Sequence, residues 1–218
     1  MHFQTNTHHQ NIIQVLLHQH GIFHLRHLKI VHSNYLNLCA YMGLIIFPWI
    51  FLQKWDLLPD PLKNALSKQL TLNRVVTGLR TYSLASGTVE YINIHRLVQE
   101  VIRKHLEIEE GNNSGVNRWL QLDFNMLESY LPTSCEEAYG VSQFMPIAIH
   151  AESIADHYSI LVKTKSLKLK IANLYDKIGD CYDDCGIFDN AFRNYSSSLH
   201  IKELYLGKKH SENSDTIW

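Results

Sequence analysis

Residues 171–210 read IANLYDKIGDCYDDCGIFDNAFRNYSSSLHIKELYLGKKH and decide the fold of this chain. Bulky and small residues recur here at the spacings of two short helices that pack as an antiparallel pair: Tyr175, Ile178, Gly179, Tyr182, Gly186, Ala191, Tyr195 and Leu199. Gly186 lies where the chain must turn, because glycine readily adopts the positive φ that ends a helix. Gly179 and Ala191 lack large side chains, so we expect the two helices to touch at these residues. The stretch predicts a stackable helical hairpin, which is typical of a binding scaffold.

This hairpin resembles a tetratricopeptide repeat. Downstream, Leu206-Gly207 and Asp215-Thr216 are similar to the linker of the kinesin-light-chain type of repeat, although Ser211 stands where that linker usually has proline. The resemblance covers about one repeat, at 166–210, with 211–218 as the start of a truncated further one. It implies an α-α superhelical region whose repeat face binds a protein or peptide partner.

The composition is that of a folded, mainly α protein. The chain has 218 residues, of which 45% are hydrophobic and 19% charged, enough to bury the core of one or two domains. Its net charge of −1, without a clustered basic stretch, argues against a nucleic-acid partner. The four cysteines are few for this length, and no signal-peptide pattern is present, so we expect reduced thiols and a cytoplasmic location.

Two of these cysteines, Cys181 and Cys185, are four residues apart and would share one face of a helix. They could bind a metal or form a redox pair. Two soft ligands without a second pair make an incomplete zinc site, whereas small packing groups are common in helices. We therefore expect no metal and no cofactor.

Histidines are concentrated near the N-terminus. His20, His24 and His27 would share one helical face, which is a suitable spacing for metal ligands. However, the first carboxylate residue of the chain is Asp56, so no acidic ligand or orienting carboxylate accompanies them. We expect residues 1–35 to be a poorly defined histidine-rich leader.

The most apolar run is 36–52, LNLCAYMGLIIFPWIFL. Its length approaches that of a membrane span, but it contains Asn37, Gly43 and Pro48 and lacks asymmetric flanking charges. We expect a buried helix that stops before Pro48, and no membrane contact.

Residues 36–110 predict a winged-helix-like domain with a small β-hairpin. The expected order is two helices, two strands joined through 86–88, and a closing helix, at Pro59–Gln69, Leu72–Leu79, Tyr82–Leu84, Tyr91–Ile94 and His95–Leu106. With its upstream LNLCAYM, the segment TYSLASGTVEYINIHRLVQEVIR resembles the winged-helix region of signal-transduction NTPases of the NB-ARC class that carry tetratricopeptide repeats.

In that class the histidine after the wing strand contacts the ADP phosphates, so the resemblance implies this role for His95 where a nucleotide-binding domain is present. The family often has a methionine-histidine-aspartate motif, whereas this chain has Ile94-His95-Arg96. The alternative, that His95 only caps the following helix, stays open.

Catalytic motifs are absent from the sequence. No segment has the GxxxxGK[ST] pattern that cradles phosphates, and no serine elbow, zinc-protease helix or dinucleotide turn occurs. Acidic residues cluster near Gly186 at Asp180, Asp183, Asp184 and Asp189, but without the spacing of a calcium-binding loop. We expect no enzyme activity, no catalytic residues and a solvated acidic face.

Between these two regions, residues 116–165 predict a helical linker or cap. The loop Gly111–Gly115 separates it from the upstream domain, and helices are expected at Val116–Leu131, ended by Pro132, and within Ala138–Leu161.

The sequence thus favours a protein–protein interaction scaffold, a fragment of an NB-ARC and tetratricopeptide signalling switch in which the winged helix relays nucleotide state. One alternative is a winged-helix DNA-binding regulator, with Leu72–Leu79 as the recognition helix. Another is a nonfunctional truncated fragment.

Overall fold

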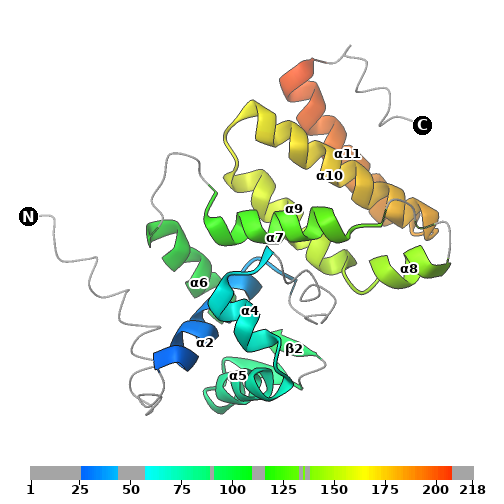
Figure 1. Ribbon diagram of the computed structural model, residues 1–218. Coiled ribbons are helices and arrows are strands. Elements are labelled where there is room, and N and C mark those ends of the chain that lie inside the picture. The colour runs from blue at the N-terminus through cyan, green and yellow to red at the C-terminus, as the bar shows by residue number, and fades with distance from the viewer. Residues whose placement is uncertain are drawn as a thin grey trace, which may run out of the picture. The chain divides into compact units, whose positions relative to one another are not determined.

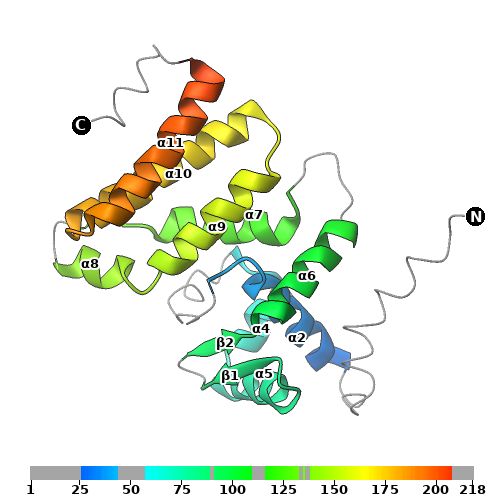
Figure 2. The same ribbon diagram turned by 180° about the vertical axis from the view of Figure 1, so that it is seen from behind.

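The computed structural model describes residues 26–43, 57–88, 91–109, 116–132, 135 and 138–207 (Figures 1 and 2). This part of the chain is mainly helical, with nine helices and one antiparallel sheet of two strands. The chain divides into two compact units, Met1–Ala40 with Leu44–Gly111, and Tyr41–Gly43 with Asn112–Trp218. Among the described residues, no helix combines the length and the apolarity that crossing a membrane requires.

The helices of the first unit pack around α2. The elements are α2 (Arg26–Cys39), α4 (Asp60–Leu66), α5 (Gln69–Thr81), β1 (Ala85–Gly87), β2 (Ile92–Ile94) and α6 (Arg96–Glu109). α2 contacts α4, α5 and α6. Its last carbonyls lack helical partners, and α6 supplies them: Gln99 Nε2 donates to Cys39 O at 2.8 Å and Arg103 donates to Ala40 O at 2.6 Å.

The apolar run 36–52 is described only as far as residue 43. α2 begins at Arg26, inside the expected leader, and ends at Cys39, before Pro48. The side chains of Arg103 and Gln99 bind the carbonyls at this end, which stabilises the early stop. Residues 44–56 lie outside the described part, as do His20 and His24 of the histidine cluster, whereas His27 lies in α2.

The first strand of the hairpin was predicted at the wrong residues. Tyr82–Leu84, the expected strand, closes α5 instead: Ser83 has φ 55°, and the Leu84 amide donates to Leu79 O at 2.9 Å. This is the Schellman ending of a helix, here without glycine. Ser86 and Gly87, expected in the turn, therefore belong to β1, where Ala85 pairs with Ile94 and Gly87 with Ile92.

The second unit is built from five described helices, α7 (Arg118–Tyr130), α8 (Ala138–Phe144), α9 (Ala148–Leu161), α10 (Lys165–Asp184) and α11 (Phe188–Leu206). Asn117 begins α7 by accepting hydrogen bonds from the amides of Trp119 and Leu120, both at 3.0 Å. α9 packs against α7 and α10, and Figure 1 shows α10 and α11 running side by side. The helices predicted between 116 and 161 are thus present, the second region as two helices.

Candidate functional site

The turn between α10 and α11 lies at Gly186, the residue that the sequence marks for it. Gly186 has φ 71°, and its amide donates to Asp183 O at 2.8 Å. The Ile187 amide donates to Tyr182 O at 2.8 Å, which completes a Schellman ending. Phe188 then begins α11 directly, so the two helices form a tight hairpin.

Gly179 lies against the ring of Tyr195. A Cβ at position 179 would lie 2.7 Å from Cε1 of Tyr195, closer than real Cβ contacts. The Tyr195 ring fills the space that a side chain at 179 would take, and its hydroxyl donates to Asp180 Oδ1 at 2.7 Å. Ala191 is buried one turn nearer to Gly186. The close approach is therefore one of a backbone to a ring.

A buried ion pair, which the sequence analysis missed, joins the same two helices. Lys202 Nζ lies 2.6 Å from Asp176 Oδ2, and the side chain of Lys202 is only 6% exposed. Breaking such a pair leaves a charge in a poorly solvated place. The opposite charges at these two positions gave no helical-spacing signal, because they lie 26 residues apart.

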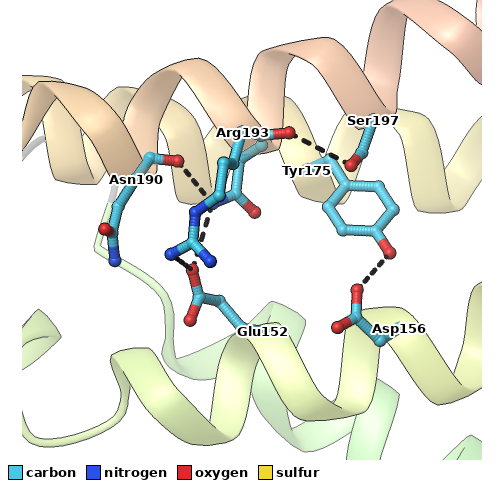
Figure 3. A network of polar contacts seen from close by, with 7 residues as sticks. Glu152, Asp156, Tyr175, Asn190, Arg193 and Ser197 are labelled. Atoms are coloured by element: carbon cyan, nitrogen blue, oxygen red, sulfur yellow. Dashed lines mark hydrogen bonds and ion pairs between the residues drawn. The ribbon is translucent and has the colours of Figure 1, made fainter.

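Polar side chains also connect α9 to the hairpin, as Figure 3 shows. Glu152 of α9 lies 3.5 Å from Arg193 and accepts a hydrogen bond from Asn194 at 3.3 Å. Tyr175 of α10 donates to Asp156 Oδ1 of α9 at 2.7 Å. Burial raises the pKa of Tyr175, which keeps its hydroxyl protonated as a donor. These bonds hold α9 on the hairpin in one orientation.

The other residues that the sequence analysis predicted to pack the hairpin are buried or half-buried. Ile178 is fully buried, and the ring of Tyr182 meets that of Phe144 at 4.9 Å, edge to face. Leu199 is half-buried. Because these side chains pack against the protein itself, a partner would have to bind residues outside this set.

Exposed residues of α10 form a strip along the helix, in which Asp180 and Asp184 also accept hydrogen bonds from the Tyr195 hydroxyl and the Cys135 amide. Its members recur at alternating steps of three and four residues, so they share one helical face: Lys170, Asn173, Lys177, Asp180 and Asp184. We call them the α10 outer strip. Two lysines lie toward its start and two aspartates toward its end, so the strip offers donors and acceptors in separate halves.

The charges of α10 oppose its helix dipole. Lys165 and Lys168 lie in its first turn and Asp183 and Asp184 in its last, with no acidic residue in the first turn and no basic residue in the last. The dipole favours the opposite placement, by roughly 0.3–1 kcal/mol for each charge. The charges on α10 are therefore not arranged for helix stability, and such local conflicts are common where a surface has a function.

Partial burial raises the pKa of Asp180 in this strip. The neighbouring carboxylates Asp176, Asp184 and Asp183 raise it further, while the hydrogen bond from Tyr195 lowers it. A cation from a partner would relieve this repulsion.

α11 exposes two phenylalanines on successive turns. Phe188 is 65% exposed and Phe192 is 63% exposed, beside the half-buried Leu199 along the same face. Large exposed aromatic side chains that lie together are unusual on a protein surface without an interaction partner.

His95 lies between β2 and α6 and caps the helix. Its Nδ1 accepts from the Leu97 amide at 3.4 Å, and its own amide donates to Leu84 O at 3.2 Å. The side chain is exposed, so its remaining nitrogen is open to solvent. The capping role is therefore present, and a phosphate contact would use the other ring nitrogen.

Cys135 lies against the end of α10, which the sequence analysis did not predict: its amide donates to Asp184 Oδ2 at 2.8 Å. In α10 itself, Cys181 is buried and Cys185 half-buried. Within the described residues, no group of histidine, cysteine, aspartate and glutamate side chains suits a metal ion, including the acidic residues around Gly186.

Comparisons of the chain with protein-family models, with curated proteins and with solved structures gave no match. The function therefore has to be argued from the exposed chemistry of the hairpin. On the α10 outer strip that chemistry consists of ammonium and amide donors on one half and carboxylate acceptors on the other.

Proposed function

We propose that this chain is a non-enzymatic protein–protein interaction scaffold, in which the α10 outer strip binds a protein or peptide partner. The observation that carries the proposal is the charge order of α10, which opposes the helix dipole at both ends. A partner with carboxylates facing Lys170 and Lys177, and a cation facing Asp180, would pair with the charges that the α10 outer strip exposes.

The tetratricopeptide reading is part of this proposal. It is supported by the antiparallel α10–α11 pair, its glycine turn and the ring packed on Gly179. In stacked repeats each helix pair covers the apolar face of the preceding one. Phe188 and Phe192 are exposed on α11, and the resemblance implies that a following helix would cover such a face; its expected start at 211–218 lies outside the described residues.

The second part of the proposal is that the winged-helix-like region relays nucleotide state. The order of elements from α2 to α6, with a small hairpin before the last helix, supports it. In this reading His95 would contact nucleotide phosphates supplied by a separate nucleotide-binding domain, while its Nδ1 keeps the helix cap.

The test is selection of linear peptides from a displayed library on the purified chain, followed by calorimetric titration of the enriched peptides. We expect enrichment of aspartate and glutamate, and binding at least tenfold weaker for Lys177→Glu. Lys165→Glu is the matched control, because Lys165 is an exposed lysine of the same helix that lies off the α10 outer strip.

Equal weakening by the two substitutions, or no enriched peptide, would contradict the proposal. Tight, salt-dependent binding of duplex DNA would favour the DNA-binding alternative, for which α5 exposes Arg74 and Arg80.

A further inference from the structure

The α10 outer strip carries its charges in an order that a reversed copy of the same strip complements. Lys170 and Lys177 lie in its first part, and Asp180 and Asp184 lie in its last. When two copies of one helix lie antiparallel across a twofold axis, the first part of each strip faces the last part of the other. Lysines of one copy then meet aspartates of the partner, whereas a parallel pair would bring like charges together.

The spacing of the strip fits one antiparallel register. Where Lys177 faces the partner's Asp180, the twofold axis repeats the contact in reverse, so two ion pairs form. The same register places Asn173 opposite the partner's Asp184. The Asp184 carboxylate accepts the Cys135 amide at 2.8 Å and has capacity for a further donor, which the amide of Asn173 supplies. Both halves of the strip therefore find partners of the right chemistry at once.

Lys177 and Asp180 are open to such contacts. Both are exposed, and within the described part of the chain neither belongs to an ion pair, although they lie only three residues apart on α10. Asp180 instead accepts the Tyr195 hydroxyl at 2.7 Å, which holds the carboxylate in place. A carboxylate accepts more than one hydrogen bond, so a lysine from a second copy can bind Asp180 while Tyr195 keeps its contact.

Exposed ion pairs alone stabilise little, so a dimer also needs apolar area. Phe188, Phe192 and Tyr195 follow one another at steps of four and three residues and therefore share one face of α11. The two phenylalanines are largely exposed, and the Tyr195 hydroxyl reaches Asp180 of the strip. The aromatic face thus borders the acidic half of the strip, and a copy seated on the strip can cover both.

We propose that a second copy of this chain occupies the α10 outer strip, with Lys177 of each copy paired with Asp180 of the other and with Phe188 and Phe192 supplying apolar area beside these pairs. In this dimer the lysines that an acidic peptide would bind are already engaged. Peptide and second copy therefore compete for the strip. The competition rests on the proposed function, whereas the dimer itself does not.

The test is sedimentation velocity of the full chain, under reducing conditions, over a range of protein concentrations. We expect a monomer–dimer equilibrium that high salt weakens, because salt screens exposed charges. Lys177→Glu and Asp180→Lys should each weaken the dimer by about tenfold or more, since each places like charges opposite one another twice. Lys165→Glu is the matched control and should leave the dimer unchanged, because Lys165 lies off the strip.

Mixing the two variants separates a lost contact from a change in folding. In an equimolar mixture of Lys177→Glu and Asp180→Lys, the new glutamate of one chain faces the new lysine of the other. The unchanged Asp180 of the first chain likewise faces the unchanged Lys177 of the second. We therefore expect the mixture to form a dimer that neither variant forms alone.

The inference is overturned by a wild-type chain that stays monomeric at every concentration, by a dimer that Lys177→Glu and Lys165→Glu weaken equally, or by a mixture that does not restore the dimer. Peptide binding by a chain that stays monomeric would overturn the dimer and leave the proposed function intact. A dimer restored in the mixture, without any enriched peptide, would support the dimer and count against peptide binding.

Discussion

The ring of Tyr195 occupies the side of Gly179 where a Cβ would otherwise point, at 2.7 Å from the Cβ position, and its hydroxyl reaches Asp180. One side chain of α11 thus contacts two neighbouring residues of α10. Its ring packs against the backbone of Gly179, and its hydroxyl binds the carboxylate of Asp180. This relationship makes position 179 sensitive to a single methyl group.

Gly179→Ala tests this contact. In an open helix the change stabilises by roughly 1 kcal/mol, because alanine has the better helix propensity. Here we expect destabilisation of about 1–2 kcal/mol, since the new methyl displaces the ring and breaks its bond to Asp180. Chemical denaturation measures the change. In a Tyr195→Ser background the same substitution should become neutral or stabilising, and a penalty that persists there would show that the ring is not its cause.

The ion pair between Lys202 and Asp176 predicts a second non-additive result. Lys202→Met should destabilise by about 3 kcal/mol, because it leaves the partly buried Asp176 carboxylate without its cation. The double substitution Lys202→Met with Asp176→Leu should recover most of that loss, since no buried charge remains. Thermal or denaturant unfolding of Lys202→Met, Asp176→Leu and the double variant measures the three changes in stability. If the change in the double variant equals the sum of the two single changes, the prediction is refuted.

Asp123 predicts a pH dependence. It is fully buried in α7, and among the described residues neither carboxylate oxygen has a hydrogen-bond partner. Burial raises its pKa well above the ordinary value. The folded state therefore holds the proton more tightly than the unfolded state, and this residue lowers stability as pH rises above about 4.

Asp123→Asn removes that titration. The stability of the variant minus that of the wild type should grow by about 1.4 kcal/mol for each pH unit between about pH 4 and the raised pKa of Asp123, and then level off. Denaturant unfolding of both proteins at pH 4.5 and 7.5 gives this stability difference. The contributions of the other titrating groups cancel in it, because the two proteins share those groups. A difference independent of pH would mean that Asp123 is not buried as an uncompensated acid.

Two exposed aspartates on either side of Gly186 should respond in opposite directions to the same substitution. Asp183 lies in the last turn of α10 and Asp189 in the first turn of α11. Asp183→Asn should stabilise by about 0.5 kcal/mol and Asp189→Asn should destabilise by about as much, because the helix dipole favours an anion only at the second position. Melting curves at low salt compare them, and 1 M salt should reduce both effects.

The sequence was most informative where glycine and helical spacing agree. The turn at Gly186 and the helix from Arg118 to Tyr130 follow from local signals, because a Schellman glycine, apolar residues at helical spacing and Pro132 all act within a few residues. The strand at Ala85–Gly87 was misplaced because Ser83 ends α5 at φ 55° without the glycine that usually marks this ending.

Contacts between distant residues could not be predicted in this way. Cys135 and Asp184 lie 49 residues apart, and no periodicity connects them. The same holds for Lys202 with Asp176. Asp123 differs, because it lies on the buried face of α7, three residues after Leu120 and four before Leu127, where the apolar spacing already marks a buried position. The spacing predicted a close approach at Gly179 but not that the ring of Tyr195 makes it, because a periodic pattern does not identify the partner of a small residue.

The most direct test of the interaction scaffold is hydrogen–deuterium exchange of the chain with and without a selected acidic peptide. The account predicts slower exchange in α10, concentrated at 170–184, and no such protection for Lys177→Glu at the same peptide concentration. Protection confined to α4, α5 and α6, with α10 unchanged, would contradict it.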